Sequence, residues 1–149
     1  MIIRDLYIEQ YRWHVHCYFA VTNYYTGEIL DILESLRCSD AVYNKVAKKL
    51  ERNELNTGFT YSNKIARETL MVIGLASSNA EYINSITHEL RHLCDDIASV
   101  VGIHDSGEEV AYLTGDVASQ MADIIEVLVC DCLNCLDRRY KKIRPMRSK

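Results

Sequence analysis

Residues 78–102, SNAEYINSITHELRHLCDDIASVVG, carry the helical pattern around which the rest of the chain can be organised. Ser78 followed by Glu81 has the form of a capping box, which predicts a helix beginning at about residue 79. Gly102 is typical of the residue that ends a helix in the left-handed conformation. The sequence therefore predicts one long helix over residues 79–101, with HELRH near its middle.

Strand and helix patterns precede this helix. Residues 13–21, WHVHCYFAV, alternate between two faces, which is typical of a half-buried strand. Ser39 is a suitable cap for a helix that begins at Asp40. The other expected elements are a partner strand over 3–11, helices over 27–37 and 40–53, a turn at 56–58, and strands over 58–63 and 69–74.

A second long helix is expected from about residue 107 to residue 137. Small residues recur along it at spacings of four, three and four, which would let it lie close to the HELRH helix: Ala111, Gly115, Ala118 and Ala122. The expected fold class is α+β, with a small, mostly antiparallel sheet packed on helices and two long helices at the end. We expect one domain over residues 1–137 and a basic, flexible tail over residues 138–149.

Composition narrows the classes of function. The chain has 149 residues, the size of one domain, and no apolar run near the ~20 residues that span a bilayer. The first residues lack the apolar core of a signal peptide, so we expect a cytoplasmic protein whose six cysteines are thiols. Residues 138–149 hold seven of the 17 basic side chains, which leaves 10 basic and 21 acidic side chains in the body. An acidic body argues against nucleic-acid binding there, and only the tail has the charge for nucleic acid or an acidic partner.

The motif His88-Glu89-Leu90-Arg91-His92 has the spacing of a zinc site. Histidines at i and i+4 lie on one face of a helix, so both imidazoles can reach a single ion. Glu89 is rotated by ~100° from His88 and can act as a general base on a water that zinc activates. We therefore expect a Zn²⁺ hydrolase with His88 and His92 as ligands and Glu89 as the catalytic base.

A catalytic zinc needs a third protein ligand. Ala98 stands where the HExxHxxGxxH pattern has its third histidine, so that pattern is excluded. Glu108 is the preferred ligand because it lies on the small-residue stripe, and Glu109 is the second choice. The remaining candidates are His104, Asp95 and Asp96, of which Asp95 fits better as an acceptor that orients an imidazole.

Catalysis also needs a group that stabilises the oxyanion. Tyr112, one turn after Glu108, is the first candidate. Weaker candidates for this role are Arg91, Tyr61 and His104.

HELRH followed by GEEVAYL resembles the gluzincin branch of zinc metallopeptidases, in which a glutamate ligand lies on a later helix. Residues 56–118 also resemble small HExxH proteins of Bacteroides-type bacteria and their phages. The resemblance implies a minimal zincin fold and a zinc metallopeptidase with a peptide or protein substrate, Glu108 being the third ligand. It also implies that an edge strand before the active helix holds the substrate. Residues 69–74 are the candidate for this edge strand.

Other interpretations remain open. A zincin fold used for binding or assembly in a phage or mobile element would also contain HELRH, with zinc structural or vestigial. A helical interaction protein with a chance motif is the third alternative. Cys130, Cys132 and Cys135 have the spacing of half a zinc knuckle, but they also fit a continuous helix that buries free thiols.

Overall fold

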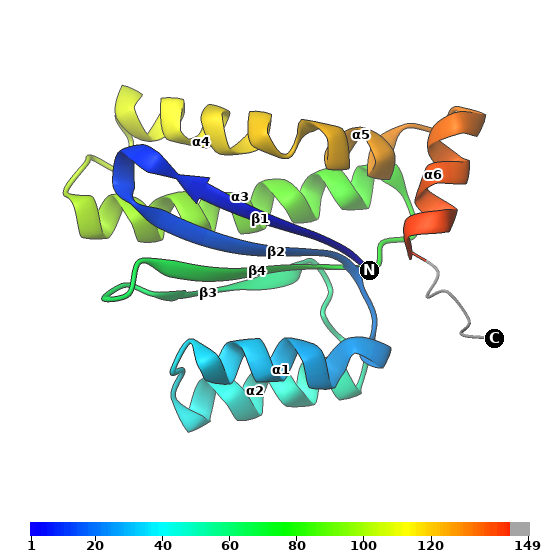
Figure 1. Ribbon diagram of the computed structural model, residues 1–149, viewed down its shortest axis with the longest axis horizontal. Coiled ribbons are helices and arrows are strands. Elements are labelled where there is room, and N and C mark those ends of the chain that lie inside the picture. Colours follow the sequence, from blue (N-terminus) through cyan, green and yellow to red (C-terminus); the bar gives the residue numbers. More distant parts are fainter. Residues whose placement is uncertain (144–149) are drawn as a thin grey trace.

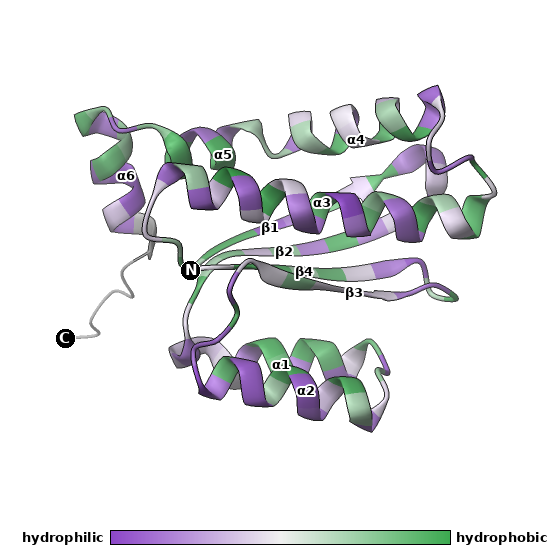
Figure 2. Ribbon diagram, turned by 180° about the vertical axis from the view of Figure 1, so that it is seen from behind, coloured by the Kyte–Doolittle hydropathy of each residue, from purple (hydrophilic) through white to green (hydrophobic). Residues whose placement is uncertain are grey.

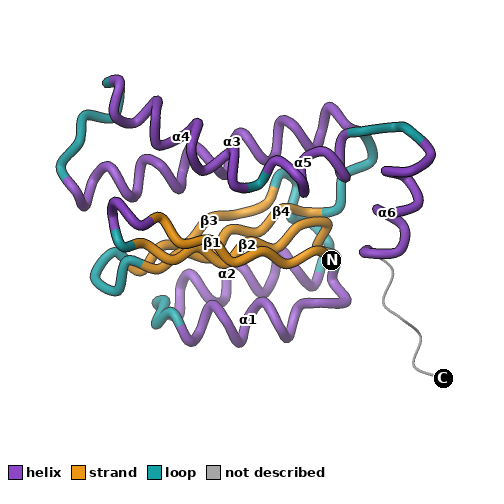
Figure 3. Tube along the Cα trace, turned by 45° about the horizontal axis from the view of Figure 1, so that its top comes forward, coloured by secondary structure: helices purple, strands orange, loops and turns teal. Residues whose placement is uncertain are grey.

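The computed structural model describes residues 1–143, with side chains to residue 141. It has three layers, in which a four-stranded sheet lies between two groups of helices (Figures 1 and 3). The strands are β1 (Ile2–Ile8), β2 (Trp13–Val21), β3 (Gly58–Asn63) and β4 (Glu68–Gly74). The helices are α1 (Thr26–Ser35), α2 (Asp40–Glu51), α3 (Asn79–Val101), α4 (Glu108–Gln120), α5 (Ala122–Val129) and α6 (Leu133–Ile143), with short 3₁₀ turns η1 (Glu9–Tyr11) and η2 (Asn23–Tyr25).

The strands lie in the order β1-β2-β4-β3. The β1–β2 and β3–β4 pairs are antiparallel hairpins, whereas β2 and β4 are parallel. The expected α+β class and mostly antiparallel sheet are therefore confirmed. The choice of residues 69–74 as the edge strand was wrong: β4 pairs on both sides, and β3 forms the edge.

Two cores lie on the two faces of the sheet. Trp13, Cys17 and Phe19 of β2 face the core under α3, α4 and α5, while Tyr18 and Val21 face the core over α1 and α2. β2 is therefore buried on both faces along its second half, where the sequence predicted a half-buried strand. The difference arises because alternation alone does not reveal that the α1–α2 pair covers the second face.

α3 has the predicted bounds and caps. The hydroxyl of Ser78 accepts a hydrogen bond from the Glu81 amide at 3.2 Å, and Gly102 takes the left-handed conformation with φ of 77°. The carboxylate of Glu81 accepts from the amide and hydroxyl of Ser77. Among the described residues, no helix has the length and apolar character required to cross a membrane.

The second long helix predicted over residues 107–137 was wrong. Three shorter helices, α4, α5 and α6, occupy this region, and the predicted tail boundary at residue 137 falls inside α6. The small-residue stripe as a whole does not mediate the contact with α3 either, because Ala111, Gly115 and Ala122 are exposed and only Ala118 of the four packs against the core. Residues 144–149 of the predicted tail lie outside the described residues.

α4 instead uses larger apolar side chains. Val110, Leu113 and Val117 are its buried residues, and they join the core that α3 shares with the sheet. They recur at spacings of three and four, which is the helical core pattern. Of the predicted stripe, Ala118 is half-buried and packs against this core, Ala111 and Gly115 are exposed on α4, and Ala122 is exposed at the start of α5.

His16 on β2 lies between two carboxylates. Its Nδ1 is 2.8 Å from Asp5 Oδ1 on β1, and its Nε2 is 2.8 Å from Glu68 Oε1 on β4. Burial by itself would lower the pKa of His16, but the hydrogen bonds to Glu68 and Asp5 outweigh it and raise that pKa. Folding therefore favours the imidazolium form of this side chain.

We expect His16 to make stability depend on pH. A pKa raised by folding gives stabilisation that is present below the unfolded-state value of about 6.5 and is lost as pH rises through the folded-state value. Relative to His16→Gln, the wild type should gain about 1 kcal/mol near pH 6, since the partners are partly exposed. Urea unfolding of both chains at about pH 6 and pH 8.5 measures the difference. An equal gap at both pH values would exclude a charged His16.

Candidate metal centre

His88 and His92 form a pair on the exposed face of α3. Their Nε2 atoms are 3.1 Å apart, and the two rings lie edge to face. Two imidazole nitrogens bound at 2.0–2.1 Å to one tetrahedral zinc are separated by about 3.3 Å. The distance between the two Nε2 atoms is therefore close to that between two ligands of a single ion.

The histidines open onto a pocket between α3 and β3. Figure 2 shows α3 on the same side of the sheet as α4 and α5, and α3 contacts both β3 and β4. The pocket has a volume of about 450 Å³. Its lining residues come from α2, from the turn before β3, from β3 itself and from α3, and the last group consists of His88, Glu89, His92 and Asp96.

Glu89 lines this pocket and is only 2% exposed. Its Oε2 accepts a hydrogen bond from the Thr60 hydroxyl at 2.8 Å, and its Oε1 is 3.3 Å from the Thr57 hydroxyl. Two hydroxyl donors thus hold a buried carboxylate beside the histidine pair. Burying a carboxylate costs free energy unless hydrogen-bond donors compensate it. The hydroxyls of Thr57 and Thr60 supply that compensation for Glu89.

The rotation of α3 produces this placement. Leu90, Leu93 and Ile97 turn inward to the core, which leaves His88 and His92 facing outward. Glu89 follows His88 by ~100° about the helix axis. Its side chain is therefore directed to the start of β3, where the two threonines lie.

Gly58 brings the start of β3 close to β4. It has a φ of 144°, and a Cβ added there would lie 1.9 Å from the backbone oxygen of Val72. Only glycine fits this approach. The position of Thr57 and Thr60 against α3 therefore depends on Gly58.

The two glutamates predicted as ligands lie elsewhere. Glu108 and Glu109 are exposed in the first turn of α4. Burial and then the charge of Glu109 raise the pKa of Tyr11, which places Glu109 toward the β1–β2 connection. Within residues 1–141, the structure does not bring either glutamate into a three-ligand group with the histidines; the one such group is Cys130, Cys132 and Cys135.

Most of the other predicted site residues also lie outside the pocket lining. Tyr112 is 70% exposed on α4, and His104 contacts Ser106 in the loop before it. Asp95 pairs with Arg91 on α3, at 2.8 Å.

Asp96 is the exception, since it lines the pocket one helical turn after His92. Its Oδ1 is 2.9 Å from the Nζ of Lys64, which follows β3. This ion pair ties the end of β3 to α3.

The roles of Thr57 and Thr60 were not predicted. A threonine in a strand is ordinary, since β-branched residues favour strands. The hydroxyls reach Glu89 because β3 packs against α3. The sequence carries no local signal for that contact.

Removal of the Thr60 hydroxyl should destabilise the fold. Thr60→Val keeps the shape but deprives the buried Glu89 of its shorter hydrogen bond, which should cost about 1–3 kcal/mol. Thr57→Val is the matched control and should cost less, because its contact is 3.3 Å long. Urea unfolding of the two variants tests the order. Equal costs would contradict the expected order, and no cost in either variant would mean that these hydroxyls do not hold Glu89.

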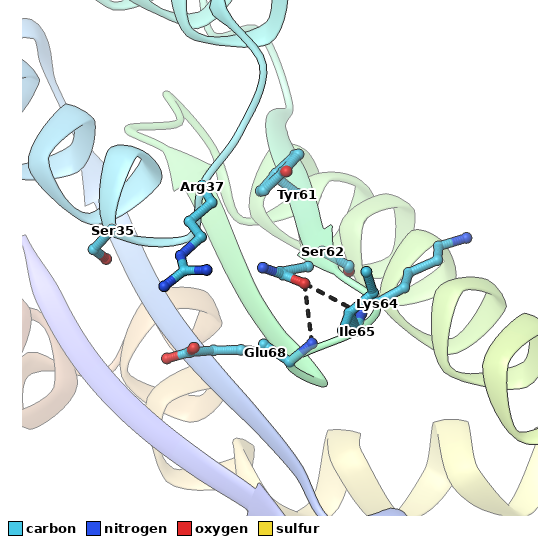
Figure 4. Close-up of a pocket in the computed structure, with 9 residues that line it drawn as sticks. Ser35, Arg37, Tyr61, Ser62, Lys64, Ile65 and Glu68 are labelled. Carbon is cyan, nitrogen blue, oxygen red and sulfur yellow. Dashed lines mark hydrogen bonds between the residues drawn. The ribbon is translucent and has the colours of Figure 1, made fainter.

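A second pocket, of about 780 Å³, lies beside the β3–β4 turn. Figure 4 shows the side chains of Arg37, from the connection between α1 and α2, and of Glu68, from β4, among the residues that line it. It contains no histidine and no cysteine, and Glu68 is already bonded to His16. His88, Glu89 and His92 of HELRH line the smaller pocket and not this one.

Comparisons of the chain with protein-family models, with curated proteins and with solved structures found no match. The assignment of a function therefore depends on the geometry of the site.

Proposed function

We propose that the protein is a zinc-dependent hydrolase that acts on a peptide or protein. The observation that carries the proposal is the shared pocket of three groups: two Nε2 atoms 3.1 Å apart and a buried carboxylate one residue on from the first. A chance motif on a surface helix would have no reason to bury Glu89 and bond it to two threonines. That combination argues against an incidental pair of histidines.

Each side chain has a distinct chemical task. Zinc held by His88 and His92 would supply a Lewis acid that polarises a carbonyl and acidifies water. Glu89 accepts the proton of the attacking water and passes it to the leaving amine. Thr57 and Thr60 orient the carboxylate of Glu89 for this transfer.

The edge of β3 provides the proposed substrate site. Its outer edge pairs with no described strand, and residues 56–60 line the pocket beside the histidines. An edge strand offers free amide and carbonyl groups that an extended peptide can pair with. A peptide added there would pass directly over the histidine pair.

The third protein ligand is a carboxylate in this proposal. Asp96 is supported by its place in the pocket, and Glu108 by the resemblance of GEEVAYL to the gluzincin pattern. Asp96→Asn and Glu108→Gln distinguish the two, because loss of a direct ligand should weaken zinc binding by at least ~100-fold. If neither variant loses zinc affinity, neither carboxylate is a ligand, and solvent molecules complete the coordination by the two histidines.

Zinc titration tests the metal site. In a chain whose Cys130, Cys132 and Cys135 are replaced by serine, we expect His88→Ala and His92→Ala each to lower zinc affinity at least ~100-fold, because each removes one of two imidazoles. His14→Ala is the control, since His14 is exposed on β2 and lies outside the pocket. Unchanged affinity in both site variants would exclude this pocket as a zinc site.

A non-catalytic binding or assembly protein is the second candidate. The observation in its favour is that the described residues bring only two imidazoles together, with no third ligand in contact. Zinc binding without any cleavage, together with peptide binding at the β3 edge, would support this alternative.

A further inference from the structure

The break between α5 and α6 has a chemical consequence. In a continuous helix, Cys130 and Cys132 would be rotated by ~200° and would point to opposite sides. Instead α5 ends at Val129, Cys130 is extended with φ of −85° and ψ of 129°, and α6 begins at Leu133. The turn directs three sulfurs to one place.

The three cysteines form a compact group. The Sγ atoms of Cys130, Cys132 and Cys135 all lie within 4.8 Å of one another. Thiolates bound at about 2.3 Å to a tetrahedral zinc are separated by about 3.8 Å, so closure needs movements of about 1 Å. Cys135 is buried, Cys130 is partly buried and Cys132 is exposed, which leaves one side open for entry of an ion.

Contacts from outside the group fix its backbone. Arg139 on α6 donates to the carbonyls of Val127 at 2.8 Å and Cys130 at 2.9 Å, which joins the end of α5 to α6. Asn79 at the start of α3 donates to Asp131 at 2.5 Å. The turn is therefore held on both sides of Cys132, and the position of the sulfurs is not that of a loose loop.

The start of α6 also favours a thiolate. Cys132 directly precedes the helix, and its Sγ accepts a hydrogen bond from the amide of Cys135 at 3.4 Å. Amide groups at a helix N-terminus stabilise a negative charge, and the thiolate is the form that binds metal.

We propose that Cys130, Cys132 and Cys135 bind one zinc ion through three thiolates, at a site separate from the α3–β3 pocket, and that this ion fastens α6 to α5. Thiolates select zinc or another soft ion over magnesium or calcium. Three thiolates leave a fourth position, which a solvent molecule fills. The site is independent of the proposed hydrolase activity, since its ligands come from other elements.

Cobalt titration can test the cysteine site without any contribution from the histidine pair. Reduced protein carrying both His88→Ala and His92→Ala should bind one equivalent of Co²⁺ with a near-ultraviolet thiolate-to-cobalt charge-transfer band, and zinc should abolish it. Cys132→Ser and Cys135→Ser should each raise the Kd at least ~100-fold, whereas Cys38→Ser should leave it unchanged. The wild-type chain should show the same band, so the test does not depend on folding of the histidine variant. Absence of the band, or its survival without the three cysteines, would overturn the proposal.

Trypsin sensitivity provides a second readout. Arg138, Arg139 and Lys141 lie on α6, so zinc should slow cleavage there in the wild type at least tenfold. Zinc should have no such effect when all three cysteines are serine. Equal cleavage with and without zinc would overturn the proposal. A disulfide between two of these three cysteines, located by peptide mass in freshly purified zinc-free protein, would overturn it too.

Discussion

Glu89→Gln is expected to reduce peptide cleavage by about 10²–10⁴-fold while leaving zinc binding intact. The substitution keeps the shape of the side chain and its ability to accept from Thr60, but it removes the group that takes a proton. Because Glu89 is hydrogen-bonded to Thr57 and Thr60 and not to either imidazole, its loss should not alter the two imidazole ligands. Cleavage of a peptide library, with zinc content measured on the same samples, tests both expectations.

Glu126→Gln is the matched control for this substitution. Glu126 is exposed on α5 and lies outside the pocket, so its variant should cleave at the wild-type rate. Full activity in Glu89→Gln would refute the catalytic base. Loss of activity together with loss of zinc would instead assign Glu89 to metal binding.

Gly58→Ala is expected to destabilise the protein by about 3–5 kcal/mol, at the upper end of single substitutions. The added Cβ would lie 1.9 Å from the Val72 carbonyl oxygen, and the φ of 144° is open to glycine alone. β3 must therefore move away from β4, which would also displace Thr57 and Thr60 from Glu89. We expect zinc affinity to fall together with stability.

Gly115→Ala supplies the contrast in the same chain. Gly115 lies within α4, and an added Cβ there meets nothing within 4 Å. This variant should be more stable by up to about 1 kcal/mol, because alanine is the better helix former. Urea unfolding of both variants tests the pair. A cost at Gly58 no larger than about 1 kcal/mol would show that β3 does not need this close approach.

Local signals were sufficient to predict much of the fold. Ser39 and Ser78 cap α2 and α3 as expected, and Gly102 ends α3. These features depend on contacts within a few residues, and those contacts are visible in the sequence. The histidine pair was predictable for the same reason, because i and i+4 share one helical face.

Contacts between distant elements could not be predicted in the same way. The order of strands in the sheet makes β3 the edge, although β4 has the more apolar sequence. The stripe from Ala111 to Ala122 has a helix period, yet Val110, Leu113 and Val117 form the buried face instead. Periodicity shows that faces exist, but it does not show which face the core will take.

The helix break at residues 130–132 was missed for a related reason. The segment has no proline or glycine, so its composition favours a continuous helix. The side chain of Arg139, one of the basic residues assigned to the tail, holds the turn by bonding to carbonyls of Val127 and Cys130. A contact of this kind depends on α6 folding back, and it leaves no pattern in the segment itself.

Anomalous diffraction at the zinc absorption edge, from crystals grown with excess zinc, tests the central claim most directly. We expect a peak at about 2.0–2.1 Å from the Nε2 atoms of both His88 and His92, in the pocket beside β3. The peak should vanish in His88→Ala and remain in the variant that lacks all three clustered cysteines. An empty position between these two nitrogens, with zinc in excess, would contradict the account.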